Sequence, residues 1–127
     1  MKVRLKGDSI RMRLGMAEVK SLADGREVNN VTHLPGGVFL QIGIVPHPEG
    51  GMCTVALEGA VMTVAVSRDA LAGWAGSPTE CLLFELPVSD KTMLKISVEK
   101  DFGCLKTRAA EEDADSYSNP SAGSDRC

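Results

Sequence analysis

Five basic residues alternate with apolar residues near the start of the chain. Successive side chains of a strand point to opposite faces, so one face of a hairpin should carry Lys2, Arg4, Lys6, Arg11 and Arg13. Lysine and arginine bind carboxylates and phosphates, and arginine does so through two parallel hydrogen bonds. The spacing predicts a face that recognises a phosphate, a nucleotide or an acidic protein surface. Two alternatives remain open: a solvated face that discourages aggregation between strand edges, or a face covered by the acidic C-terminal residues of the same chain.

Cysteine and histidine side chains offer a second type of site, a metal or thiol centre. Its candidate residues are Cys104, which follows the last expected strand, with His33 and His47. Metal sites usually draw ligands from close sequence pairs, and the four cysteines form none. Cys53 and Cys81 are expected to be small buried side chains of strands. We therefore predict no cofactor.

No sequence motif points to catalysis. The Gly36-Gly37 and Gly50-Gly51 pairs are typical of turns, because no helix bearing Lys-Ser or Lys-Thr follows them. Neither a GxSxG elbow nor an HExxH motif is present. Glu99, Lys100 and Asp101 alternate between the two faces of a strand, so they form no ready acid/base dyad. A nucleophile pair of Cys104 with a distant histidine is left open.

The leading interpretation is a non-enzymatic binding module that recognises a protein partner or a small anion through the basic first hairpin. The alternative is a metal- or thiol-dependent protein centred on Cys104.

The composition is that of a globular protein without a nucleic-acid or membrane signature. Of the 127 residues, 43% are hydrophobic and 24% charged, which excludes wholesale disorder. A net charge of −3 gives no general attraction to nucleic acid, and 4% aromatic residues argue against a base-stacking platform. No apolar stretch approaches the roughly 20 residues of a membrane helix, and no segment resembles a targeting signal. We expect a cytoplasmic monomer or homodimer.

The apolar pattern of the first half recurs in the second. When the sequence is shifted by 52 positions, Val3 falls on Val55 and Gly7 on Gly59, and the correspondence continues into a helical pattern to Leu34-Pro35 and Leu86-Pro87. Two added residues after that point keep the last strands aligned. Apolar positions that keep phase through a change of period from two to about 3.6 indicate an internal duplication.

Each repeat is predicted to be ββαββ, with turns at glycine, proline and aspartate. Short helices are expected at 16–23 and 68–75, beginning at Gly15 and Ser67. The strands of repeat one are expected at 2–6, 9–14, 27–34 and 38–45, and the last two of repeat two at 79–86 and 91–99.

The predicted fold class is α+β. The two ββαββ repeats, about 2–46 and 54–100, would share one core in a single domain of residues 1–108. They would form either a closed or half-open β-barrel or two facing sheets, with two short helices covering the open ends. Residues 109–127 are small, polar and acidic, which predicts a flexible tail.

Two end motifs resemble those of an uncharacterised family of bacterial proteins about 120 residues long. They are the opening MKVRLKGDSIRMRL and the block EKDFGCL, residues 99–105, followed by an acidic stretch ending Asn119-Pro120. The resemblance runs through Pro120 and implies no activity, cofactor or catalytic residue; Ser118 departs from it, since family members tend to have proline there. It implies that the acidic tail belongs to the protein, with Phe102, Leu105 and Tyr117 as apolar anchors if the tail docks on the basic hairpin.

Overall fold

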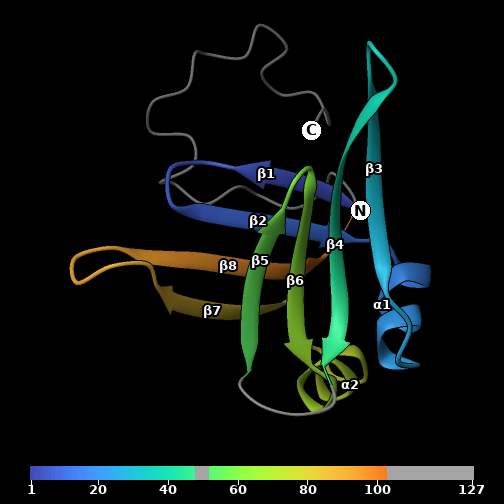
Figure 1. Cartoon of the computed structure of the whole chain (residues 1–127). Helices are drawn as coiled ribbons and strands as arrows, with labels where there is room; N and C mark the ends of the chain where they lie inside the picture. The colour runs from blue at the N-terminus through green and yellow to red at the C-terminus, as the bar shows by residue number, and fades with distance from the viewer. Residues whose placement is uncertain (48–51, 103–127) are drawn as a thin grey trace, which may run out of the picture.

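The computed structural model describes residues 1–47 and 52–102, which form an α+β fold (Figure 1). Its elements are β1 (Lys2–Leu5), β2 (Ser9–Leu14), α1 (Met16–Ala23), β3 (Val28–Leu34), β4 (Val38–His47), β5 (Cys53–Glu58), β6 (Val61–Ser67), α2 (Arg68–Ala75), β7 (Cys81–Pro87) and β8 (Met93–Lys100). Both helices span the predicted residues. Within these described ranges, no helix is both long enough and apolar enough to cross a membrane.

Local signals in the sequence explain where the elements begin and end. The Ser67 hydroxyl accepts a hydrogen bond from the Ala70 N–H at 3.3 Å, which caps the start of α2. Gly25, just beyond α1, has φ +85°, a conformation that glycine adopts without steric cost. Gly7 and Gly59 have φ of +53° and +58° in the tight turns β1–β2 and β5–β6, so these turns also need glycine.

The eight strands form two four-stranded sheets, and each sheet takes strands from both halves of the chain. Sheet A has the order β1-β2-β8-β7 and sheet B the order β3-β4-β6-β5. The two central strands of each sheet run parallel, β2 with β8 and β4 with β6, while the outer pairs are antiparallel. The strands of sheet A cross those of sheet B steeply (Figure 1).

The two sheets have matching registers, which fits the predicted duplication. Ser9 pairs with Lys95 in sheet A, and Val61, its counterpart under the shift of 52, pairs with Gln41 in sheet B. One detail of the predicted alignment is wrong. Val28 of β3 pairs with Ile44, and Leu82 of β7 pairs with Val98. The strand β3 therefore corresponds to β7 with a shift of 54 residues instead of 52. The two added residues of the second repeat thus come before its third strand and not after it.

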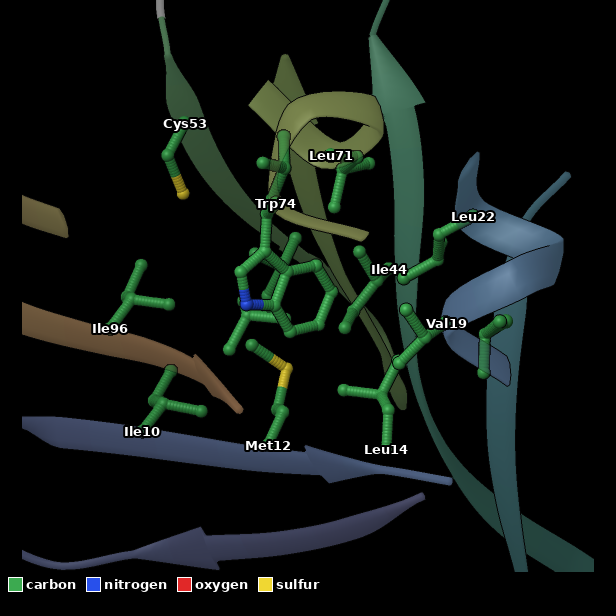
Figure 2. Close-up of a cluster of buried hydrophobic side chains, with 14 residues drawn as sticks. Ile10, Met12, Leu14, Val19, Leu22, Ile44, Cys53, Leu71, Trp74 and Ile96 are labelled. Atoms are coloured by element: carbon green, nitrogen blue, oxygen red, sulfur yellow. The ribbon is translucent and has the colours of Figure 1, made fainter. Parts of the chain in front are cut away.

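One hydrophobic core fills the space between the two sheets and the two helices. Trp74 of α2 lies at its centre with Met12 of β2, and Leu71, Ile44 and Leu22 surround them (Figure 2). Four of these five side chains are fully buried, and Trp74 is 3% exposed. Since both sheets and both helices supply side chains, the halves share one core, as predicted.

Neither sheet closes within the described residues, so the closed barrel is wrong, whereas two sheets around one core agree with the other form that the sequence allowed. Sheet A ends in β1 and β7, and sheet B in β3 and β5. No backbone ladder joins the sheets within residues 1–47 and 52–102, although β5 contacts β7 through packing. The steep crossing explains this result: the hairpins β3–β4 and β7–β8 each extend past the other sheet (Figure 1), so strand edges diverge and cannot pair.

Candidate functional site

The five predicted cations lie together on the outer side of the hairpin β1–β2, facing away from the core. We call this set the basic face: Lys2, Arg4, Lys6, Arg11 and Arg13. The alternation that places them there also buries Ile10, Met12 and Leu14 on the inner side. Lys2 pairs with Arg13 and Arg4 with Arg11 across the hairpin, so like charges lie opposite one another. Such pairs repel and are stable only where other groups offset the repulsion.

Two acids of the last strand region offset part of that charge. Parallel pairing of β2 with β8 puts Glu99 opposite Arg13. Its carboxylate accepts hydrogen bonds from Arg11, at 2.9 Å from Nε and 3.1 Å from Nη2, and lies 3.4 Å from Arg13 Nε. The Ser97 hydroxyl donates a further bond to Glu99 at 2.6 Å, and Asp101 lies 3.0 Å from Lys2 Nζ.

Glu99 is a structural carboxylate held in its charged form. Its side chain is 17% exposed. Burial raises the pKa of Glu99, but the hydrogen bonds from Arg11 and Ser97 and the charges of Arg11 and Arg13 outweigh burial and lower this pKa below 4.5. At neutral pH the carboxylate therefore fixes both guanidinium groups on the sheet surface.

The roles of Glu99 and Asp101 were not predicted from the sequence. The alternation along the strand correctly separates Lys100 from its two acidic neighbours, whose carboxylates both reach the basic face. Glu99 lies on β8, 88 residues from Arg11, and Asp101 directly follows that strand. The alternating pattern does not show that β8 lies next to β2. The sequence did contain a signal for these contacts: Glu99 and Asp101 alternate along the chain as the five cations do, which is the spacing expected of side chains on one face of a sheet.

Arg4 and Lys6 remain available to a ligand. Both side chains are exposed, and neither forms a side-chain ion pair within the described part of the chain. Arg4 lines a shallow concavity of about 190 Å³ together with Lys2, Val3, Arg11 and Arg13. Three cations in this concavity are held by acids, while Arg4 has no such acid among residues 1–47 and 52–102. This arrangement is suited to binding a carboxylate or phosphate group.

Sheet B lacks this arrangement at the equivalent positions. The counterparts of the five cations are Thr54, Ala56, Glu58, Thr63 and Ala65. Strand β4 corresponds to β8 with a shift of 54 residues. At the positions of Glu99 and Ser97 in β8, β4 has Val45 and Gly43. The charged cluster is therefore a feature of one sheet and not of the shared fold.

The predicted metal or thiol residues are not brought together where the structure describes them. His33 pairs with Phe39 near the turn of the hairpin β3–β4, whereas His47 ends β4 beside Ser67. Cys104 lies outside the described residues. Within residues 1–47 and 52–102, no three His, Cys, Asp or Glu side chains form a group that could hold a metal ion.

The two described cysteines are free thiols. Cys53 opens β5 and is buried, as predicted, and burial raises its pKa from 9.0 to about 11. Cys81 is only half-buried and begins β7, so the prediction of a buried strand interior is wrong for this residue. Its strand starts two residues later than expected, and Cys81 pairs with Glu99, so its side chain lies on the outer face of sheet A and not on the face toward the core.

Of the predicted tail anchors, Phe102 is half exposed, while Leu105 and Tyr117 lie outside the described residues.

Comparison with known proteins identifies a family but no characterised relative. No curated protein and no solved structure matches the chain. Residues 1–121 match a family of unknown function, DUF7009, and the chain belongs to that family.

Proposed function

We propose that this DUF7009 member is a non-enzymatic binding module that recognises an acidic protein partner through the basic face. The observation that carries the proposal is the unequal pairing of the cations. Among residues 1–47 and 52–102, Glu99 and Asp101 hold Arg11, Arg13 and Lys2, whereas the exposed Arg4 and Lys6 form no side-chain ion pair.

The shape of the surface supports a protein over a small anion. The cations spread over two strands around a shallow, open concavity. A small anion usually requires a concave site that surrounds it. A partner with several carboxylates can instead contact cations spread over the surface, and charged surfaces of opposite sign also speed association.

Charge reversal at Arg4 is the sharpest test. A fluorescein-labelled hexaglutamate peptide is titrated with the full chain at low salt, and the dissociation constant is measured by fluorescence anisotropy. Arg4→Glu should weaken binding by about tenfold or more, since it removes one attraction and adds a repulsion. Arg11 is unsuitable, because its reversal also breaks the contact with Glu99.

Arg68→Glu is the matched control. Arg68 is an exposed cation in the first turn of α2, where an acid is compatible with the helix dipole. The Arg68→Glu substitution changes the net charge by the same amount as Arg4→Glu. The Arg68→Glu variant should bind the peptide nearly as well as the unmodified protein. Equal affinities of the two variants would contradict the proposal. Displacement of the peptide by equimolar inorganic phosphate would point to a small anion and not a protein.

A further inference from the structure

Strand β1 has one backbone edge without a partner in the described part of the chain. It is the outermost strand of sheet A. Lys6 and Ser9 exchange both backbone hydrogen bonds at the turn, at 3.2 and 3.1 Å. Because hydrogen-bonded and non-hydrogen-bonded pairs alternate in an antiparallel ladder, the N–H and C=O groups of Val3 and Leu5 point away from β2. These groups are free to pair with another strand.

A groove runs along the inner side of the same edge. It has a volume of about 220 Å³ and is lined by Val3 and Leu5 of β1, Asn30 and Thr32 of β3, and Leu40 and Ile42 of β4. Leu5 is 62% and Leu40 43% exposed, so apolar surface faces solvent there. The free backbone groups of β1 therefore lie between an apolar groove on one side and the basic face on the other.

The equivalent positions of the second half carry larger apolar side chains. The positions that correspond to Asn30 and Thr32 are Phe84 and Leu86, which pack against the core. Strand β5, the counterpart of β1, contacts β7. At the two positions where β7 carries large apolar side chains, β3 therefore carries the smaller, polar Asn30 and Thr32, which line the groove beside β1.

We infer that an extended segment of the acidic partner adds to the free edge of β1 as a fifth strand of sheet A. Adding a strand to a sheet edge is an established mode of peptide recognition. Acidic side chains of the segment face the cations of the basic face, and the intervening apolar side chains enter the groove, because successive side chains alternate between faces. This inference rests on the proposed function and specifies the partner as a peptide in which acidic and apolar residues alternate.

The acidic run of the chain itself does not have this pattern. Its acids stand at Glu111, Glu112, Asp113 and Asp115, with only an alanine between the last two. No large apolar residue alternates with them, so a separate peptide fits the two sides of β1 better. The cations on β1 also serve selection, because they repel basic segments at the edge while admitting an acidic one.

Selective N-methylation tests whether the peptide binds through its backbone. A labelled peptide of alternating glutamate and valine is titrated with the full chain and compared with two versions, N-methylated on every valine or on every glutamate. Only one set of N–H groups faces β1 in either strand direction. We expect one version to bind at least about tenfold more weakly and the other to bind like the parent. Equal binding of all three peptides would overturn strand addition.

Leu5→Asp and Leu57→Asp provide a matched pair for the groove. The two leucines are equivalent in the repeat and are similarly exposed, at 62% and 67%. Only Leu5→Asp should weaken binding of the alternating peptide, by about tenfold or more. If Arg4→Glu weakens binding while both N-methylated peptides and both leucine variants bind normally, strand addition fails and the proposed function stands. If Arg4→Glu also has no effect, both fail.

Discussion

At the scale of single residues, the same charged surface contains groups that serve the fold and groups that are free to bind. Arg11 and Arg13 contact Glu99, and the side chain of Arg11 is only 24% exposed. Arg4 lies directly opposite Arg11 and remains exposed. The distinction between Arg11 and Arg4 follows from the strand order, because β2 adjoins β8 with Glu99 whereas β1 is one strand further away. Lys2, also on β1, contacts Asp101 just beyond the end of β8.

Replacement of Glu99 should destabilise the protein in a pH-dependent way. Glu99→Gln removes the carboxylate that Arg11 and Arg13 both contact and should lower the free energy of unfolding by about 1–3 kcal/mol at pH 7. The lowered pKa of Glu99 means that this contribution is present above the ordinary carboxyl pKa of 4.5 and is lost as the pH falls through the lower folded value. Urea unfolding of the variant and the unmodified protein at pH 7 measures the loss of stability, and the same comparison at pH 3 measures how far the loss disappears.

Glu85→Gln is the control, because Glu85 is an exposed acid on the neighbouring strand β7. Its effect should stay within about 0.5 kcal/mol at either pH. A Glu99→Gln variant as stable as the control at pH 7, or a deficit that persists undiminished at pH 3, would refute a stabilising role for the charged carboxylate.

At the scale of elements, local sequence signals predicted the helices and strands well but not their neighbours. Alternation and turn glycines located β1 and β2, and Ser67 located the start of α2, because each signal acts within a few residues. Period two likewise placed all five cations on one face. The groove beside β1 was not predictable, since it depends on Asn30 and Thr32 coming to face a strand from the other sheet.

Filling the groove should stabilise the protein and block the peptide. The double substitution Asn30→Phe with Thr32→Leu copies the residues at the equivalent positions of the second half. The added apolar surface should raise the free energy of unfolding by about 1–3 kcal/mol, measured by urea unfolding. The reverse change, Phe84→Asn with Leu86→Thr, should lower it. Loss of stability on filling would show that the groove has no room for these side chains.

At the scale of the whole molecule, each sheet is assembled from both halves of the chain. The hairpin β1–β2 pairs with β8, and β4 pairs with β6. Periodicity identifies strands, but it does not show which strands of different repeats become neighbours. The sequence therefore did not decide whether the strands close into a barrel, nor which residues Glu99 contacts. The matching registers of the two sheets fit a duplication in which the two halves exchange hairpins.

Neither half should fold alone. A fragment of residues 1–51 contains both hairpins of the first half but lacks the strands that pair with β2 and β4. Two-stranded hairpins are at best marginally stable in water. Circular dichroism and proton NMR should therefore show an unfolded fragment, and mixing it with residues 52–127 should restore the dispersed spectrum of the full chain. A folded fragment 1–51 would contradict the shared core.

The most direct test of the central claim is an NMR titration of the isotope-labelled full chain with the alternating glutamate–valine peptide. The two equivalent hairpins make the experiment internally controlled, because 2–6 and 11–13 carry the cations while 54–58 and 63–65 do not. The account predicts amide shift changes concentrated in the first hairpin, which diminish as salt screens the exposed charges. Equal changes in both hairpins, or changes confined to other parts of the chain, would contradict a binding role for the basic face.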